Sequence, residues 1–481
     1  MALPARILLK NEPTPAEARA TLFRLIRVDG IINGTNLSDT PVWPKMNQPW
    51  MLMFGRNERP QPRHAIYFVT LALDGSLNKT GLFHIDSESA RPIEIAMAKQ
   101  KPWLWKALSV GTMLDVDIVG KMNAASGKSL DESWRRIVGK GRNGKGYQIA
   151  ETQKKLRSCK FLQGLPNLDS TDLFRFVVDP NKLEKFTRSR VWRRRKSTIY
   201  DPPLVLIKEA PGENRTNGRA LLAFQRIAYN ESFNGYSGAG HPNGELLVRY
   251  VHLFVHSVIW EYYLLVTSPA FAAERRRARK SDLGKCPFMP FEALTDDQRK
   301  ELIRLSKNLE IGTAIMWEDI DAFFARLYGL QDHDLQVIQD TLSVAMPYET
   351  ARARACKPPT EQEKRAFVAA VKKPLAPLVP SHTGKLMVER IKVSISGNHL
   401  SSPFEMLLFA ANGKSPVGAI ADGVLEKIIQ IAHKTGATQI VIPESGSLVV
   451  GIYNQYRYWT LSRARLLAGD VMRYHLDMIT G

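Results

Sequence analysis

The chain has 481 residues, of which 44% are hydrophobic and 24% are charged, a composition typical of globular proteins that argues against disorder throughout. Lys and Arg number 67 against 47 Asp and Glu, which gives a net charge of +20. This excess favours a polyanionic partner over a small basic ligand, although positive charges dispersed over a solvated surface would give the same total. The length suggests three or four domains.

Cysteine usage and the N-terminal sequence indicate the compartment. The three cysteines, Cys159, Cys286 and Cys356, are widely spaced, so the sequence supports neither a disulfide framework nor a cysteine-based zinc site. Charged residues at Arg6 and Lys10 interrupt the first apolar run, so we read no signal peptide there. Together these features favour a cytoplasmic protein.

The most hydrophobic long segment is residues 246–266. Arg249, His252, His256 and Glu261 lie inside it, and such side chains are costly in a lipid bilayer. We therefore expect a buried helix here.

The first part of the chain alternates strand and helix patterns. Residues 2–10 read as a strand followed by a loop, residues 15–25 have a helical apolar period, and residues 28–32 return to a strand pattern. Residues 49–55 form a continuous apolar strand, which is typical of a sheet covered on both faces. Because the pattern begins with a buried strand that nothing precedes, residues 1–138 are expected to form the second half of an α/β domain with an insertion.

Composition changes mark the later domains. Residues 139–290 carry short strand patterns, Gly and Pro turns and arginine clusters, so their loops are expected to carry the function. Residues 291–371 read as helices, with apolar periods at 295–308, 318–327 and 335–342. Residues 372–384 contain three prolines and are a predicted linker. Residues 385–481 are expected to form a small α/β domain, with apolar patterns at 386–395, 424–432 and 439–442 and a closing helix at 462–475.

Two basic clusters are the strongest functional signal. Residues 185–196 hold seven cations and no acid, with Trp192 among them, and a second cluster spans residues 274–280. Arginines bind phosphates and can form two hydrogen bonds with a guanine edge, and an interleaved Trp can stack on a base or brace the loop. A solvated charge run remains the alternative for each cluster.

Two glycine-rich segments complete the expected DNA surface. Residues 139–146 carry three cations, and residues 230–237 place amide, hydroxyl and aromatic groups on what we expect to be a flexible recognition loop after a strand. Polar residues precede this second segment, which disfavours a dinucleotide-binding loop because such a loop follows a buried strand. The candidate DNA-binding residues are Lys140, Arg142, Lys145, Tyr147, Arg188, Arg190, Trp192, Arg193, Arg194, Arg195, Lys196, Asn230, Ser232 and Tyr236.

Three further motifs do not carry their usual chemistry. Residues 201–204, Asp-Pro-Pro-Leu, are similar to the Asp/Asn-Pro-Pro-Tyr/Phe clamp for a flipped base, but leucine cannot stack, so we predict a turn leading into a strand at 204–207. Residues 139–146 match part of a phosphate-binding loop but have Gly146 where magnesium needs a hydroxyl. His252 and His256 lack a third metal ligand and are predicted to be packed or hydrogen-bonded. We assign no catalytic, cofactor-binding or metal-binding residue.

Five segments of the chain resemble one enzyme family. Residues 323–342, Phe-Phe-Ala-Arg-Leu-Tyr-Gly-Leu-Gln-Asp-His-Asp-Leu-Gln-Val-Ile-Gln-Asp-Thr-Leu, resemble the target-recognition portion of adenine-N6 DNA methyltransferases of the type IIG restriction-modification kind, as do residues 103–112, 146–148 and 262–268. Residues 1–55 resemble the second half of their methyltransferase domain. The resemblance implies an α/β fold: a partial Rossmann-like half-sheet, a mixed α+β target-recognition domain at 139–290, a helical segment and a small C-terminal α/β unit.

The resemblance lacks the parts that perform the reaction. In the family, S-adenosylmethionine binds a Gly-rich loop and an acidic residue in the upstream half-sheet, and Asn-Pro-Pro-Tyr/Phe holds the adenine; this sequence carries neither. The resemblance therefore implies a DNA-binding half of a split methyltransferase, in bacterial restriction-modification or phage defence, with a partner chain that binds S-adenosylmethionine. The alternatives are a non-catalytic DNA-binding or assembly protein of a defence system, and a self-sufficient enzyme, which the missing motifs disfavour.

Overall fold

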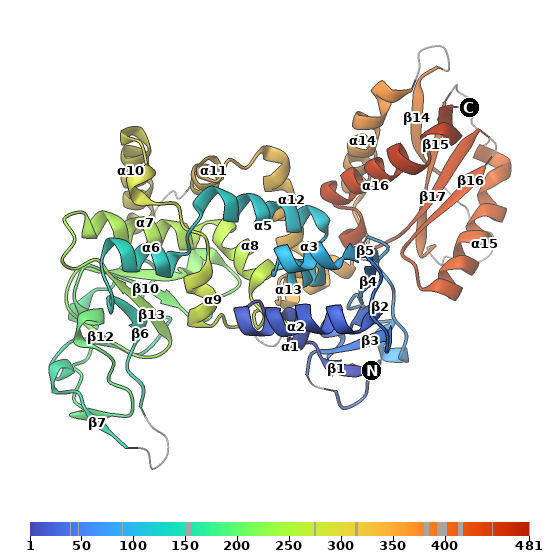
Figure 1. The fold of residues 1–481 in the computed structure, drawn as a ribbon. Helices are drawn as coiled ribbons and strands as arrows, with labels where there is room; N and C mark the ends of the chain where they lie inside the picture. The colour runs from blue at the N-terminus through green and yellow to red at the C-terminus, as the bar shows by residue number, and fades with distance from the viewer. Residues whose placement is uncertain are drawn as a thin grey trace. The chain divides into compact units, whose positions relative to one another are not determined.

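A computed structural model describes residues 1–38, 40–46, 48–88, 90–149, 155–273, 276–312, 316–379, 384–391, 402–411, 417–444 and 446–480 (Figure 1). The chain forms two compact units: unit 1 comprises Met1–Val116 and Gln336–Gly481, and unit 2 comprises Asp117–Leu335. The boundaries between the units fall within helices α5 (Met113–Ser126) and α12 (Asp332–Ala345), and do not coincide with the expected boundaries at 138, 290 and 371.

The N-terminal part of unit 1 is a five-stranded sheet with the order β1-β3-β2-β4-β5. Only the β2–β4 pair is parallel among these strands, because β3 returns antiparallel between β1 and β2. The run of parallel strands expected for a Rossmann-like half-sheet is therefore not observed. The strands are β1 (Ala2–Pro4), β2 (Arg27–Asn33), β3 (Trp50–Arg56), β4 (Ala65–Thr70) and β5 (Arg91–Glu94).

Helices cover one face of this sheet. Trp105 of α4 packs between Phe23 of α2 and Phe68 of β4, with ring centroids 5.7 Å and 5.3 Å away. The predicted helix at 15–25 is confirmed as α2, whereas part of the expected loop within residues 2–10 is the helical turn α1. The helices are α1 (Arg6–Leu9), α2 (Pro13–Leu25), α3 (Ile95–Gln100) and α4 (Leu104–Val110).

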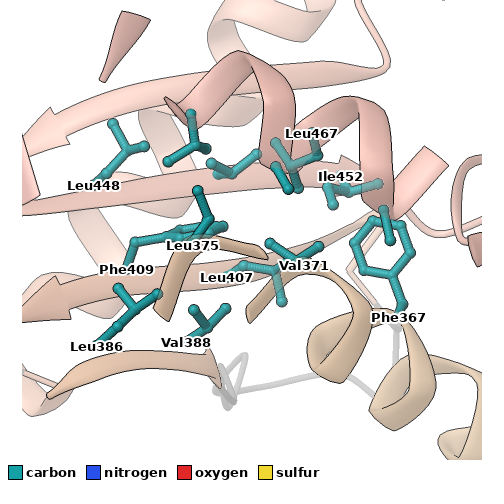
Figure 2. Close-up of a cluster of buried hydrophobic side chains, with 14 of the residues drawn as sticks. Phe367, Val371, Leu375, Leu386, Val388, Leu407, Phe409, Leu448, Ile452 and Leu467 are labelled. Carbon is teal, nitrogen blue, oxygen red and sulfur yellow. The ribbon is translucent and has the colours of Figure 1, made fainter. Parts of the chain in front are cut away.

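The C-terminal part of unit 1 is an antiparallel sheet with the order β14-β15-β17-β16 between two helical layers. Figure 2 shows apolar side chains of α14 and α16, including Phe367 and Leu467, gathered on one face. On the other face α15 approaches closely, because a Cβ on Gly451 would lie only 2.8 Å from Ile428. The elements are α13 (Glu349–Cys356), α14 (Glu361–Leu375), β14 (Leu386–Ile391), β15 (Phe404–Ala411), α15 (Val417–Thr435), β16 (Gln439–Glu444), β17 (Ser447–Tyr453), α16 (Leu461–Tyr474) and α17 (Leu476–Thr480).

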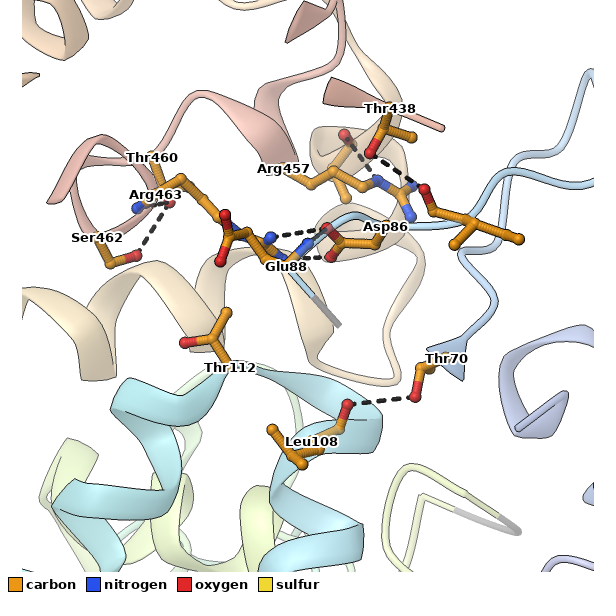
Figure 3. A network of polar contacts seen from close by, with 12 residues as sticks. Thr70, Asp86, Glu88, Leu108, Thr112, Thr438, Arg457, Thr460, Ser462 and Arg463 are labelled. Carbon is orange, nitrogen blue, oxygen red and sulfur yellow. Dashed lines mark hydrogen bonds and ion pairs between the residues drawn. The ribbon is translucent and has the colours of Figure 1, made fainter. Parts of the chain in front are cut away.

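Ion pairs join the two parts of unit 1. Arg463 of α16 donates to both carboxylate oxygens of Asp86, at 2.8 and 2.5 Å (Figure 3). Arg91 bridges Asp470 and the buried Glu88, at 3.0 and 2.5 Å. Partly or fully buried pairs of this kind make removal of either partner costly, because the other charge is left without compensation.

The predicted linker at 372–384 is partly helical. Residues 372–375 complete α14 and residues 376–378 form a 3₁₀ turn, while residues 380–383 lie outside the described part of the chain. Residues 392–395, expected to continue a strand, also lie outside it. The C-terminal helix expected at 462–475 is confirmed as α16.

Unit 2 is built on an antiparallel sheet with the order β11-β10-β13-β6. Strands β10 and β13 are buried along their whole length, and α7 packs against β10 and β11. The other strand pairs are short: β12 is parallel to β8, and β7 is antiparallel to β9. The strands are β6 (Asn143–Lys145), β7 (Arg157–Ser158), β8 (Asn167–Leu168), β9 (Arg190–Val191), β10 (Leu204–Lys208), β11 (Ala220–Ala223), β12 (Ala228–Tyr229) and β13 (Phe233–Ser237).

The buried helix expected at 246–266 is two buried helices. The break falls at Ser257, whose side chain accepts a hydrogen bond from the Trp260 amide and so caps the second helix. In the described part of the chain, no helix is long and apolar enough to cross a membrane. The helices are α6 (Leu130–Ile137), α7 (Gly244–His256), α8 (Val258–Thr267), α9 (Lys280–Lys285), α10 (Asp296–Ile311) and α11 (Trp317–Leu327).

The helices predicted at 295–308, 318–327 and 335–342 are confirmed as α10, α11 and α12. Thr295 and Gln298 form a capping box at the start of α10, and Gly312 ends the helix in the left-handed conformation, with φ +73°. Asp321 of α11 accepts hydrogen bonds from Arg215 and from the Val258 amide, and thus ties α11 to the start of α8.

His252 and His256 are buried hydrogen-bonding residues, as predicted. His252 Nε2 lies 3.1 Å from the Ala220 carbonyl, and His256 Nε2 accepts a hydrogen bond of 2.9 Å from the Arg219 amide. Burial lowers the pKa of His252 to about 3 and the pKa of His256 well below its usual range. Among described residues, no group of three potential metal ligands is present.

These histidines predict a loss of stability in mild acid. Both stay neutral when folded, whereas in the unfolded chain they take up protons below about pH 6.5, so the free energy of unfolding falls as pH drops below that value. His252→Gln retains a hydrogen-bond donor but cannot titrate, so the thermal midpoint should fall less between about pH 7.5 and about pH 5. An equal fall in both proteins would contradict this account.

Candidate nucleic-acid interface

Strand β13 lies at the centre of the candidate interface. It pairs with β10 on one side and with β6 on the other, where Gly235 stands opposite Gly144 and Tyr236 opposite Asn143. Gly235 is required here because a Cβ would lie 2.1 Å from the Tyr229 hydroxyl oxygen. Strand β6 is therefore an edge strand, and it pairs with a neighbouring strand that is fully buried.

A second wall is formed by residues 190–199. Arg193 exchanges two backbone hydrogen bonds with Gln148, of 2.9 and 3.1 Å, and Arg190 pairs with Ser158 in the β7–β9 ladder. Arg195 has a left-handed backbone, with φ +61°, and its Nε donates to the Gly146 carbonyl. These bonds hold the arginine-rich segment opposite β6.

The two walls enclose a cleft of about 910 Å³. Eight of its thirteen lining residues are Lys or Arg, and none of these described lining residues is acidic. The lining residues are Gly141, Asn143, Gly144, Lys145, Lys155, Arg157, Trp192, Arg193, Arg194, Arg195, Lys196, Ile199 and Lys280.

The lining cations differ in how firmly they are held. Arg193 stacks on the ring of Trp192, with its guanidinium carbon 4.1 Å from the ring centroid, and Arg194 donates to the Ser158 carbonyl. Lys145 forms an ion pair with Glu209. Burial and the neighbouring charge of Arg193 lower the pKa of Arg195, which indicates that positive charge is crowded in the cleft.

The structure brings six of the predicted residues together in the cleft: Lys145, Trp192, Arg193, Arg194, Arg195 and Lys196. Lys140, Arg188 and Arg190 are exposed but do not line it. Arg142 is held beside it in an ion pair of 3.0 Å with Asp201.

Residues 230–237 do not form the expected recognition loop. Residues 233–237 are the buried strand β13, and Tyr236 has no exposed surface. The Asn230 side chain donates to the Asp169 carbonyl and accepts from the Ser232 amide, so it closes a turn. Tyr147 is also buried, and its hydroxyl donates to Asn167. The two tyrosines therefore pack the domain instead of presenting their rings at its surface.

Three lining cations were not among the predicted residues. Lys280 ends the second basic cluster at 274–280, so the cleft contains residues of both clusters recognised in the sequence. Lys155 and Arg157 lie in the basic stretch 154–160, and this local excess of positive charge could have identified them as candidates from the sequence. The meeting of these segments depends on long-range pairing that local patterns do not show.

Asp131 of α6 connects the elements that form the cleft. Its Oδ1 accepts hydrogen bonds from the Tyr236 hydroxyl, at 2.9 Å, and from Asn143 Nδ2, at 2.5 Å. It also fits against Gly284 of α9, where a Cβ would lie 2.4 Å from the carboxylate. The carboxylate thus contacts β13, β6 and the helix that begins at Lys280.

The other sequence motifs have structural roles. Residues 201–203 form a turn leading into β10, as predicted, and the Asp201 carbonyl accepts from the Ser237 hydroxyl at 2.6 Å. Residues 143–145 form the edge strand β6 and not a phosphate-binding loop that opens a helix.

Substitution of Tyr236 separates packing from DNA contact. Tyr236→Phe removes one buried hydrogen bond and should lower the free energy of unfolding by about 1 kcal/mol. Tyr236→Ala also removes the ring that packs edge-on against Trp134 and should cost roughly 3 to 5 kcal/mol. Chemical denaturation measures both effects. Loss of sequence preference in a stable Tyr236→Phe protein would contradict the packing role.

No protein family matches the chain, and no curated protein matches it. Among solved structures, the type IIG restriction endonuclease BpuSI is similar at 9% sequence identity and a TM-score of 0.27, over 72% of this chain and 47% of that one. The chain thus spans about half the length of that enzyme.

Proposed function

We propose that this protein binds double-stranded DNA through the basic cleft and is the sequence-recognising component of an adenine-N6 DNA methylation system. The observation that carries the proposal is the set of eight Lys and Arg residues that line one cleft with Trp192. Lys and Arg neutralise backbone phosphates and release counterions, which supplies a large share of DNA affinity. The crowded positive charge inside the cleft is relieved when a polyanion enters.

The cleft also offers groups that can read base edges. Arg193 and Arg194 are exposed at its wall. Arginine recognises guanine through paired hydrogen bonds in the major groove. The ion pair with Asp201 holds Arg142 directly beside this surface. We therefore propose that the cleft supplies both positioning and sequence contacts.

The methyl-transfer step is proposed to depend on a separate chain. Residues 201–204 are the sequence most similar to a base clamp, but their side chains have structural roles. Asp201 forms ion pairs with Arg142 and Arg226, and Leu204 is completely buried. A partner would then bind S-adenosylmethionine and hold the adenine. Methylation of duplex DNA by this chain alone would contradict that division. The alternative function is a DNA-binding defence protein that does not methylate DNA, and it would use the same cleft. Failure of any partner chain to restore methylation would favour this alternative.

Charge removal in the cleft tests DNA binding. The triple variant Arg193→Ala, Arg194→Ala, Lys196→Ala spares Arg195, which holds the Gly146 carbonyl. Since each neutralised phosphate contributes about 0.9 to the slope of log affinity against log salt, the slope should flatten by roughly 2 to 3. Fluorescence anisotropy with a labelled duplex at several salt concentrations measures this slope.

A charge-matched control separates the cleft from net charge. Lys300→Ala, Arg304→Ala, Lys307→Ala removes the same three charges from exposed positions on α10. This variant should retain nearly the parental slope. Equal flattening in both triple variants would show that the DNA responds to total charge and would refute the cleft as the binding site.

A further inference from the structure

The second face of the N-terminal sheet in unit 1 is covered at one end only. On β3, Trp50 is 4% exposed and packs against Trp43, whereas Phe54 on the same face is 51% exposed. The same change occurs between Leu71, which follows β4 on this face and is buried, and Tyr67 of β4, which is 59% exposed. The uncovered end thus begins where the segment containing Trp43 stops.

One row of residues crosses this uncovered end. Gly30 of β2 stands opposite Phe54 on one side and opposite Tyr67 on the other. Tyr67 in turn stands opposite Pro92 of β5, which is exposed. Because neighbouring strands lie about 4.8 Å apart, the two aromatic residues stand about 10 Å apart with only a glycine between them. The row therefore presents two rings that flank a flat patch of backbone.

The exposed members of this row are two aromatic residues and a proline, with the partly buried Gly30 between the aromatic residues. Exposed aromatic rings on a sheet are suited to stacking with nucleic-acid bases. Neither ring contacts another aromatic ring among the described residues. Both rings are therefore available to stack with bases, and the charge beside them bears on which partner the row fits.

Cations lie next to the row. The loop that joins β3 to β4 begins beside Phe54 and ends beside Tyr67, and it carries Arg59 and Arg63, both exposed and without an ion pair to a described residue. Arg56, 66% exposed, ends β3 at 3.6 Å from Asp29. The one acid of the loop, Glu58, is paired with Arg27. The loop therefore places available positive charge where a nucleic-acid backbone would run.

We propose that this aromatic row, Phe54, Gly30 and Tyr67, is a second nucleic-acid site that binds single-stranded or unpaired nucleotides. The two rings stack with bases, Gly30 lets a base approach the sheet, and Arg59 and Arg63 contact phosphates. This site is separate from the duplex-binding cleft in unit 2 and does not depend on it.

The test uses the full-length chain carrying the cleft variant Arg193→Ala, Arg194→Ala, Lys196→Ala, so that binding through the cleft is reduced. The probe is a fluorescein-labelled oligothymidylate of about 20 nucleotides, which exceeds the usual footprint of one stacking platform. In this background, Phe54→Leu, Tyr67→Leu should weaken oligothymidylate binding by about tenfold or more, because each stacked base is lost. Arg59→Ala, Arg63→Ala should lower the salt slope by about 0.7 for each phosphate contact.

Two further variants test the geometry. Gly30→Val fills the space between the rings and should weaken the same binding, although its Cβ meets only the Tyr67 carbonyl at an ordinary 3.6 Å. The control Tyr474→Leu removes an equally exposed tyrosine, 59%, from α16 and should leave the affinity unchanged. Thermal melting verifies that all four proteins fold.

Two results would overturn the proposal. One is oligothymidylate affinity that is unchanged by Phe54→Leu, Tyr67→Leu in a folded protein. The other is self-association in sedimentation that these leucines abolish while oligothymidylate binding persists, which would make the row a protein interface. Duplex binding is tested separately, by comparing the cleft variant with its α10 control. A negative result for the aromatic row would therefore not change the conclusion about duplex binding.

Discussion

The cleft of unit 2 depends on one carboxylate. Asp131 accepts hydrogen bonds from Tyr236 and Asn143 and packs against Gly284, so a single side chain on α6 sets the spacing of β13, β6 and α9. Hydrogen bonds to an ionised acceptor are stronger than neutral ones, and leaving buried donors unpaired costs about 1 to 3 kcal/mol for each group. The capping box formed by Ser129 and Glu132 fixes the first turn of α6, where Asp131 lies. The positions of Asn143 and Lys280 at the cleft thus follow from contacts below its surface.

Hydrogen bonds of the backbone explain how the cationic side chains of the cleft can lie so close to one another. Backbone hydrogen bonds between Arg193 and Gln148 hold the arginine segment independently of its charges, and the Arg195 guanidinium adds a bond to the Gly146 carbonyl. The side chains at the wall are then free to meet an anion without reorganising the backbone. Burial first, and then the neighbouring charge of Arg193, lower the pKa of Arg195. Under the proposed function, phosphates that enter the cleft would compensate this positive charge.

Local patterns predicted the parts of the structure that depend on local physics. The helical periods gave α2, α10, α11 and α16 to within a few residues, and the basic stretch at 185–196 supplied most of one cleft wall. Long-range pairing could not be predicted from local patterns: β3 lies antiparallel between β1 and β2, and the Rossmann-like detail of the half-sheet is not confirmed. Residues 230–237 resembled a loop because they are rich in Gly, Asn and Ser. They form a buried strand because Gly235 makes room for Tyr229 and because Asp131, about a hundred residues earlier, satisfies Tyr236. Lys280 joined the cleft through the same long-range contacts.

Amide hydrogen exchange of the full-length chain, with and without a saturating DNA duplex, tests the central claim most directly. If DNA occupies the cleft, exchange should slow at residues 143–145, 190–196 and 280–285, which form its walls, while α10 and α11 remain unchanged. DNA-dependent protection that is absent from these three segments and concentrated elsewhere would contradict the account.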